Sequence, residues 1–218
     1  MATATAEQDQ TVADLLDRLG GIPASRVRLA PTPGTATEQD VIDVHDRTNR
    51  LCELVDGVLV EKVMGFDESI VSLLLAGSLL NYLKRHDLGK LIGADGMMRL
   101  FPGLVRIPDV AFISWKRYPK KSRKHGEIPT VAPDLVVEVL SKGNTPREMA
   151  RKFDEYFRAG VLQVWYVDPK RRKVRVFTDR NHSIALGEDE HLDGGDILPG
   201  FTLSIREWFG EAERTAPR

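Results

Sequence analysis

Two stretches decide the fold of this chain: VRIPDVAFI at residues 105–113 and PDLVVEVLSKGNTPREMARKFDEY at residues 133–156. Each contains an apolar strand with a single carboxylate inside it, Asp109 in the first and Glu138 in the second. Burial of an unpaired carboxylate costs several kcal/mol, so each requires a cation, a proton or hydrogen-bond donors nearby. We therefore expect the functional chemistry to lie where these two strands meet.

The helix after the second strand has a clear start. Thr145 is suited to the N-cap, Pro146 to the first helical position, and Glu148 to closing a capping box. Lys152 falls at the edge of the apolar face of this helix, so its ammonium group can reach past the sheet. An apolar strand over 163–167 follows. This strand, helix, strand order predicts a right-handed parallel crossover in an α/β fold.

Shorter elements flank this centre on both sides. Asp56-Gly57 between two apolar runs is a strong signal for a tight β-hairpin. The sequence predicts, in order, a helix over 11–19, a proline-rich linker over 23–37, a helix over 38–47, a hairpin over 51–63, a long buried helix over 67–86, strands over 90–100 and 105–113, a basic connector over 115–130, an antiparallel extension at 174–177 and 184–186, and a final strand or helix over 201–209.

The composition indicates one soluble globular domain. The chain has 218 residues, of which 42% are hydrophobic and 29% are charged, and no apolar run approaches the roughly 20 residues of a membrane span. The N-terminal sequence MATATAEQDQT lacks the positive and apolar regions of a signal peptide. Cys52 is the only cysteine, which excludes an internal disulfide and fits a reducing compartment. We expect a cytoplasmic protein with no membrane association.

The charge is balanced overall but unevenly distributed. The formal net charge of −1 argues against a protein whose whole surface binds nucleic acid. Basic residues nevertheless gather over 116–124 and over 170–173, where a solvated loop and a phosphate-contacting patch are equally compatible with the sequence. The first cluster comprises Lys116, Arg117, Lys120, Lys121, Arg123 and Lys124.

Two carboxylates on neighbouring strands would form a site for a hard divalent cation. Mg²⁺ binds through one or two carboxylates and retains several waters, and it can polarise a phosphodiester and generate a hydroxide. A nearby lysine can orient the attacking water or stabilise the phosphate. Spacing alone leaves a structural carboxylate pair open as the alternative. The sequence lacks zinc-ligand histidine spacing, a glycine-rich phosphate loop and a GxSxG motif.

Several motifs in a fixed order resemble those of one protein family. They are ELVDGVLVEKV at 53–63, RIPDVAFIS at 106–114, PDLVVEVLS at 133–141, and TPREMARKFDEYFRAGV at 145–161 followed by a tryptophan and VDP. In this combination the chain resembles the Uma family of predicted endonucleases, in the PD-(D/E)xK nuclease superfamily. The resemblance implies a restriction-endonuclease-like core, with a mixed central sheet flanked by helices, an N-terminal β-hairpin and a C-terminal antiparallel extension. It covers residues 38–209, leaving 1–37 as an N-terminal helix and linker and 210–218 as a tail.

The resemblance also assigns roles to individual residues. Asp109 would be the aspartate of the PD motif and Glu138 the acidic residue of the second half-motif, and both would be ligands of Mg²⁺ or Mn²⁺. The superfamily usually has a lysine two residues later, where this chain has Leu140. The resemblance therefore points to Lys152, on the next helix, as the residue that takes over the role of this lysine.

A glutamate on the first helix often completes such sites. Glu68 is the candidate for this role, and Glu53 is its competitor. The chain departs from the family pattern at Gln163 and Val164, where an acidic residue and a tyrosine are common. This departure concerns a secondary site residue and leaves the central set of Asp109, Glu138 and Lys152 in place.

The leading hypothesis is a Mg²⁺-dependent or Mn²⁺-dependent endonuclease that cleaves DNA and contacts its backbone through the connector over 116–124. One alternative is a nuclease fold that has become a non-catalytic nucleic-acid-binding or regulatory module. Another is a hydrolase that acts on RNA or on a small phosphodiester with the same residues. Because many nucleases that cut both strands act as dimers, a homodimer is left open.

Overall fold

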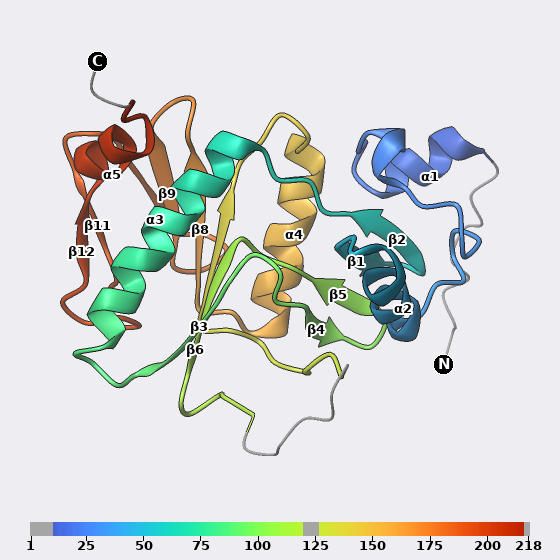
Figure 1. Ribbon diagram of the computed structural model, residues 1–218, viewed down its shortest axis with the longest axis horizontal. Helices are drawn as coiled ribbons and strands as arrows, with labels where there is room; N and C mark the ends of the chain where they lie inside the picture. Colours follow the sequence, from blue (N-terminus) through green and yellow to red (C-terminus); the bar gives the residue numbers. More distant parts are fainter. Residues whose placement is uncertain (1–10, 120–126, 216–218) are drawn as a thin grey trace.

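The computed structural model describes residues 11–119 and 127–215, and two β-sheets form the centre of the molecule (Figure 1). The larger sheet contains, in spatial order, β10 (Ser183–Leu186), β9 (Lys173–Phe177), β8 (Gln163–Asp168), β7 (Leu135–Val139), β6 (Val110–Ser114) and β3 (Gly89–Ile92). The smaller sheet contains β2 (Val58–Glu61), β1 (Cys52–Val55), β5 (Leu104–Arg106) and β4 (Met98–Phe101).

The larger sheet is mixed, as predicted. Its β7 and β8 pair in parallel, whereas the other neighbouring strands in this sheet pair antiparallel. Helix α4 (Pro146–Ala159) connects β7 to β8, which confirms the predicted parallel connection through a helix. The helix starts where the sequence indicates, because the Thr145 hydroxyl accepts a hydrogen bond from the Glu148 N–H at 3.0 Å. It ends at Gly160, whose φ of 93° suits glycine.

The predicted hairpin is also present. Asp56 and Gly57 join β1 to β2 with φ angles of 49° and 71°, the two left-handed positions that such a turn requires. The predicted antiparallel extension at the C-terminal side is formed by β9 and β10. The segment over 201–209, predicted as a strand or a helix, contains one of each: β12 (Thr202–Ser204) leads directly into helix α5 (Ile205–Ala212). β12 pairs with β11 (His191–Asp193).

Each of the two strands predicted over 90–100 and 105–113 is in fact two strands. The first divides into β3 and β4, and the second into β5 and β6, with one half of each in either sheet. Pro108 lacks an N–H to donate to a sheet ladder, and the turn over 93–96 is rich in glycine. Asp109 therefore lies in the break between β5 and β6, rather than inside a strand as predicted, and its N–H donates to Val137 O at 3.1 Å.

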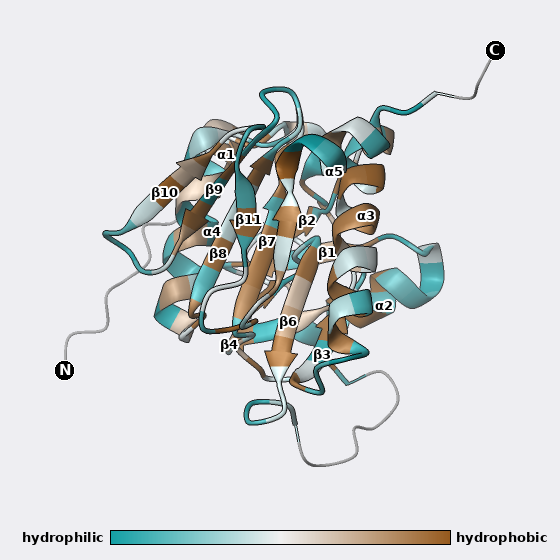
Figure 2. Ribbon diagram, turned by 90° about the vertical axis from the view of Figure 1, so that its left-hand side faces the viewer, coloured by the Kyte–Doolittle hydropathy of each residue, from teal (hydrophilic) through white to brown (hydrophobic). Residues whose placement is uncertain are grey.

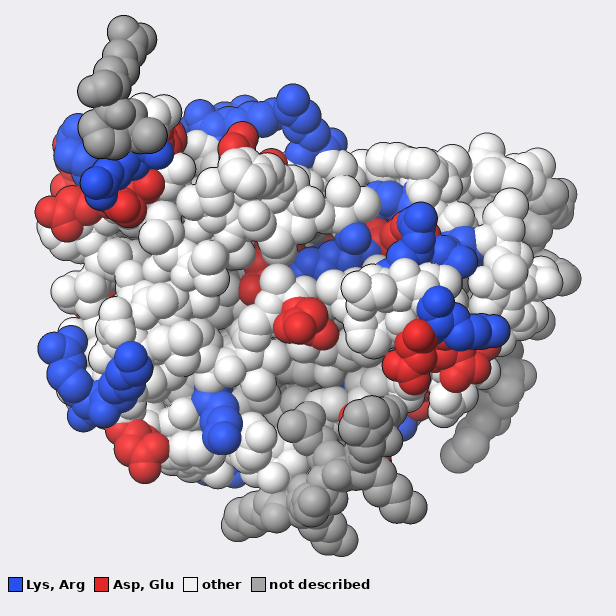
Figure 3. Space-filling model, viewed as in Figure 1, with Lys and Arg blue, Asp and Glu red and all other residues white. Residues whose placement is uncertain are grey.

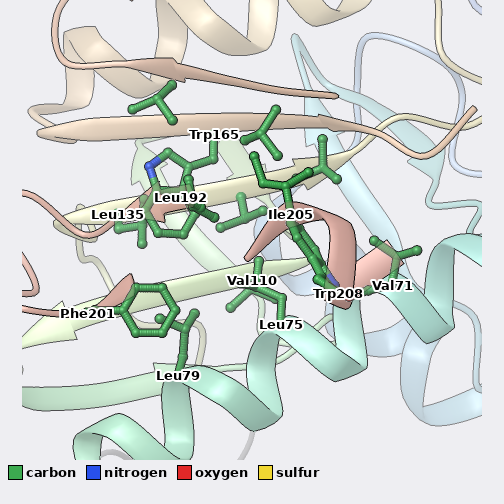
Figure 4. Packing of buried hydrophobic residues seen from close by; sticks show 14 of the residues in the cluster. Val71, Leu75, Leu79, Val110, Leu135, Trp165, Leu192, Phe201, Ile205 and Trp208 are labelled. Atoms are coloured by element: carbon green, nitrogen blue, oxygen red, sulfur yellow. Dashed lines mark hydrogen bonds between the residues drawn. The ribbon is translucent and has the colours of Figure 1, made fainter. Parts of the chain in front are cut away.

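Helices cover the two faces of the larger sheet differently. Helix α3 (Phe66–Leu83) and α5 pack on one face, where Leu75 and Leu79 join Trp165 and Val137 in the main hydrophobic core (Figure 4). Helix α4 lies on the other face, where Tyr156 is fully buried. Figure 2 shows the apolar strands β6, β7 and β8 side by side between these layers.

The N-terminal region packs partly against the α4 face and partly, through its last helix, against the smaller sheet. It comprises α1 (Val12–Arg18), a short 3₁₀ helix (Ala24–Arg26) and α2 (Glu38–Thr48). Leu15 and Leu19 belong to the same hydrophobic cluster as Tyr156, and the Thr145 hydroxyl donates to Gly20 O at 2.5 Å.

Among the described residues, no helix is long and apolar enough to cross a membrane.

Candidate active site

Asp109 and Glu138 come together at one pocket. The antiparallel pairing of β6 with β7 places the start of β6 beside the end of β7, where Glu138 lies. The Val139 N–H donates to Asp109 Oδ2 at 2.6 Å. This hydrogen bond fixes Asp109 beside the last residue of β7, which directly follows Glu138. Both carboxylates are buried, with 6% and 4% exposure, and both line the pocket. The predicted convergence of these two residues is present in the structure.

Helix α4 supplies two partners to Glu138. The Lys152 ammonium lies 3.1 Å from Glu138 Oε1 and 3.3 Å from Oε2, and the Tyr156 hydroxyl donates to Oε1 at 2.5 Å. Lys152 and Tyr156 are one helical turn apart, so both point from α4 toward the sheet. The side chain of Lys152 thus reaches Glu138 from the next helix, although the sequence position two residues after Glu138 is occupied by Leu140.

Lys62, which follows β2, supplies the cation to Asp109. Its Nζ lies 2.9 Å from Asp109 Oδ1 and donates to Ile107 O at 2.6 Å. Lys62 is not among the site residues predicted from the sequence. The available signal was its place in the family-like motif ELVDGVLVEKV, where it is the only cation.

Glu53 is a buried member of the same network. Its Oε1 lies 3.1 Å from Lys152 Nζ and accepts the Ile107 N–H at 3.1 Å, while its Oε2 lies 2.7 Å from Arg106 Nη1. The Arg106 guanidinium also contacts Glu155 on α4, at 2.5 Å. Glu53 therefore shares Lys152 with Glu138 and shares Arg106 with Glu155.

Glu68 lies at the same pocket but in a different setting. It is in the first turn of α3 and lines the pocket together with Asp109 and Glu138. Its carboxylate folds back over Gly65, into the space that a side chain at position 65 would fill. The structure thus brings both predicted competitors to the pocket, with Glu53 inside the ion-pair network and Glu68 at the wall.

Arg26 brings the N-terminal region to the pocket wall. Its guanidinium makes a two-point contact with the Glu148 carboxylate, at 2.8 and 3.0 Å, and both side chains are buried. Glu148 thus faces Arg26 rather than closing the capping box predicted from the sequence. Figure 3 shows basic and acidic side chains side by side in a hollow on the face of the molecule seen in Figure 1.

The ion pairs set the protonation states of the network. Burial raises the pKa of Glu138 above its ordinary value, although Lys152 favours the ionised form. Burial opposes ionisation of Glu53 as well, but the combined charges of Lys152 and Arg106 hold its pKa below the ordinary value. Burial alone would lower the pKa of Lys152, yet Glu138 and Glu53 raise it. Lys152 therefore stays cationic and Glu53 anionic, whereas burial favours the protonated form of Glu138.

The donor set fits a hard divalent cation, but the pocket is closed and charge-paired. Carboxylate oxygens of Asp109, Glu138 and Glu68 line it, and such oxygens are the ligands that Mg²⁺ prefers. Its volume is about 20 Å³, room for about one water molecule. Within residues 11–119 and 127–215, no three acidic, histidine or cysteine side chains are grouped closely enough to hold a metal. A divalent ion would therefore bind only after a lysine has moved off its carboxylate.

The described start of the basic connector, Lys116 and Arg117, lies away from this pocket. Lys116 follows the C-terminal end of β6, whereas Asp109 precedes its N-terminal end. Arg117 pairs with Asp134 at 3.3 Å and donates to Gly160 O at 2.7 Å. The remaining members of the cluster, Lys120, Lys121, Arg123 and Lys124, lie outside the described residues.

Comparisons with known proteins agree with the fold and the motifs. A family model described as "Putative restriction endonuclease" matches residues 39–206. A solved structure, that of a putative nuclease of the DUF820 family from Anabaena variabilis, aligns with a TM-score of 0.66 and 17% sequence identity. The alignment covers 79% of this chain and 98% of that chain, which confirms the predicted nuclease-like α/β core. None of the curated proteins matches this sequence.

Proposed function

Because this chain belongs to the Uma2 family, described as putative restriction endonucleases, we propose that it is a metal-dependent nuclease that hydrolyses phosphodiester bonds in DNA. Membership in this family supports a nuclease role. The observation that carries the proposal for this chain is the convergence of Asp109 and Glu138, from two neighbouring strands, on a pocket that also contains Lys62 and Lys152. Carboxylates and lysines in one pocket are the groups that phosphodiester hydrolysis requires.

Asp109 and Glu138 are the residues that would hold Mg²⁺ or Mn²⁺. When bound, such an ion polarises a phosphodiester and lowers the pKa of a coordinated water. Asp109 is oriented for this role by the Val139 N–H, and Glu138 by the Tyr156 hydroxyl. Both orienting groups are donors from well-packed elements, so each carboxylate is held in a defined orientation.

The two lysines have different surroundings and, we infer, different roles. Lys152 is held between Glu53 and Glu138, so it keeps Glu138 oriented and provides fixed positive charge. Lys62 is held by one carboxylate and one carbonyl oxygen. It is the cation that would leave Asp109 when the site opens, and its ammonium could then approach a non-bridging oxygen of the phosphate.

DNA contacts at this edge can come from the loops after β7 and β8. These strands are parallel, so the exposed Lys142 and Lys170, which follow them, lie at the same end of the sheet as Glu138. Lysines at such positions neutralise backbone phosphates irrespective of sequence. Lys116, at the described start of the basic connector, would then contact DNA farther from the pocket. The single, buried Cys52 fits the cytoplasmic location that we infer for such an enzyme.

Plasmid cleavage with matched carboxylate variants tests the proposal. Supercoiled plasmid is incubated with the protein and Mg²⁺ or Mn²⁺, beside the variants Asp109→Asn and Glu138→Gln. We expect both variants to lose at least about 100-fold in nicking rate. Asp134→Asn is the control, because Asp134 is equally buried and also follows a proline but lies at the other end of β6. Equal nicking by all four proteins would identify a contaminant and refute the proposal.

One observation favours the alternative of a non-catalytic nucleic-acid-binding module: both carboxylates are already paired with lysines. Under that alternative, calorimetric titration with Mn²⁺ would give no heat of binding, and mobility-shift assays would show DNA binding without cleavage. The remaining alternative is a hydrolase that acts on RNA or on a small phosphodiester. Cleavage of one of these substrates, assayed in parallel, without cleavage of the plasmid would identify it.

A further inference from the structure

The outward face of α3 carries a line of large apolar side chains that the other described residues leave exposed. Phe66, Leu73 and Leu80 are 80%, 72% and 49% exposed. They are seven residues apart, so they form one straight line along a helix of 18 residues, which is about 27 Å long. The opposite side of the helix is buried in the main core through Val71, Leu75 and Leu79, as an ordinary surface helix would be.

The same face is free of charge over most of its length. The sequence from Ser69 to Leu83 contains no charged residue. Figure 1 shows α3 at the front of the molecule, and in the same view Figure 3 shows an uncharged area over it. Single exposed apolar residues are common on soluble proteins, but a continuous apolar line of this length marks an interaction surface.

The two ends of the helix carry opposite charges. Exposed Asp67 is in its first turn, and exposed Lys84 and Arg85 follow its last turn. When two identical helices pack antiparallel, the acidic end of each one lies near the basic end of the other. Their dipoles also oppose each other favourably in this arrangement. The face is therefore complementary to a second copy of itself, and only in the antiparallel direction.

Gly77 provides the point of closest approach. It lies on the outward face between Leu73 and Leu80, and a Cβ atom added there would meet no atom within 4 Å. A crossing centred beside Gly77 brings Leu73 of one copy against Leu80 of the other, twice by symmetry, and leaves Phe66 to cover the aliphatic stems of Lys84 and Arg85.

From these observations we propose that the protein forms a twofold-symmetric homodimer through the outward face of α3, with the two helices antiparallel and crossing near Gly77. A helix pair of this length buries less than the roughly 800 Å² per partner of a standard interface. The dimer should therefore be reversible, with a mass that rises with protein concentration. This inference is independent of nuclease activity.

Sedimentation equilibrium of the full chain tests the proposal. We expect the wild-type protein to associate to a dimer over the range of about 5 to 200 μM, a range set by typical affinities of small interfaces. Leu73→Glu and Gly77→Glu should each be monomeric throughout, with an unchanged circular dichroism spectrum, because both positions face solvent in the monomer. Leu29→Glu is the matched control: Leu29 is 74% exposed but lies outside α3, so this variant should still dimerise. A wild-type protein that stays monomeric, or variants at 73 and 77 that still dimerise, would overturn the proposal.

Charge exchange tests the antiparallel direction separately. Asp67→Lys and Arg85→Glu should each weaken the dimer about fivefold in dissociation constant, and the double variant should recover most of this loss. If the loss of dimer affinity in the double variant equals the sum of the losses in the two single variants, the antiparallel arrangement is wrong.

Discussion

The two faces of the larger sheet differ in their buried groups: the α3 face is packed with apolar side chains, whereas the α4 face combines an apolar cluster with a buried ion-pair network. On the α3 side, the strands contribute Val137, Val139 and Trp165 to a core formed by apolar side chains. On the α4 side, Glu138 comes from the same strand as Val137 and meets Lys152. The difference follows from the alternation of β7, which turns adjacent residues to opposite faces.

This contrast shows where the molecule gains stability and where it accepts a cost. Apolar burial on the α3 side stabilises the fold in proportion to the area removed from water. A buried ion-pair network only partly recovers the desolvation of its members, and it becomes strongly unfavourable when one member is missing. The α4 side therefore depends on a complete network, a requirement that is easier to understand for a functional site than for a structural core.

The largest expected effect concerns the apolar face. Trp165→Ala should lower the free energy of unfolding by about 3 to 5 kcal/mol, because Trp165 is fully buried in the main core. Trp115→Ala, at a tryptophan that is 42% exposed, should cost less than about 1 kcal/mol. Urea denaturation measures both, and similar losses for the two variants would contradict the placement of the core.

The charged face should respond differently to single and double substitutions. Lys152→Met should cost about 3 kcal/mol, because it leaves Glu53 and Glu138 buried without their shared cation. Adding Glu138→Gln to this variant should recover part of that loss, since one of the two buried carboxylates left without a cation is then removed. If the two substitutions destabilise additively in urea denaturation, the network is not coupled as the distances indicate.

Acidification should weaken the charged face selectively. The pKa of Glu53 is held below its ordinary value of 4.5 by Lys152 and Arg106, against the effect of burial. Its contribution to stability is therefore complete above about pH 5 and is lost as the pH falls, because the unfolded chain takes up a proton that folded Glu53 resists. The stability difference between wild type and Glu53→Gln should shrink by at least about 1 kcal/mol from pH 7 to pH 3. A difference that is constant across denaturation curves at these pH values would refute this assignment.

The smallest expected effect separates the two lysines. Lys62→Met should raise the affinity for Mn²⁺ about fivefold, which is roughly 1 kcal/mol, because Asp109 Oδ1 no longer has a competing cation. Isothermal titration calorimetry of the wild type and the variant measures this change without any substrate. Weaker Mn²⁺ binding by the variant would mean that Lys62 supports the ion rather than competing with it.

Local patterns in the sequence predicted most of the elements. The Asp56-Gly57 turn, the capped start of α4 and the apolar periodicity of α3 are each encoded within a few neighbouring residues, and all three are present. The divided strands were not predicted because apolar alternation continues through Ile107, which is buried although it belongs to neither β5 nor β6.

The partners of the candidate site residues were harder to predict than the acidic residues themselves. Two carboxylates in apolar strands stand out in any sequence, but Lys62 is 47 residues from Asp109, and Arg26 is 122 residues from Glu148. Glu53 could be read as an exposed hairpin residue, yet it is 1% exposed because its side chain faces the network with Arg106. Such pairs depend on how remote segments dock, which local pattern does not encode.

The contact between Arg26 and Glu148 has a practical consequence for how this protein is produced. The segment that defines the family starts at residue 39, so a clone trimmed to that boundary would lack Arg26. Glu148 would then sit in the interior at the beginning of α4 with its counter-charge deleted, directly beside the residues that carry the proposed chemistry. An inactive or insoluble product from such a truncation would reflect the loss of this arginine and of the core residues Leu15 and Leu19, and would not test whether the 218-residue chain cuts DNA.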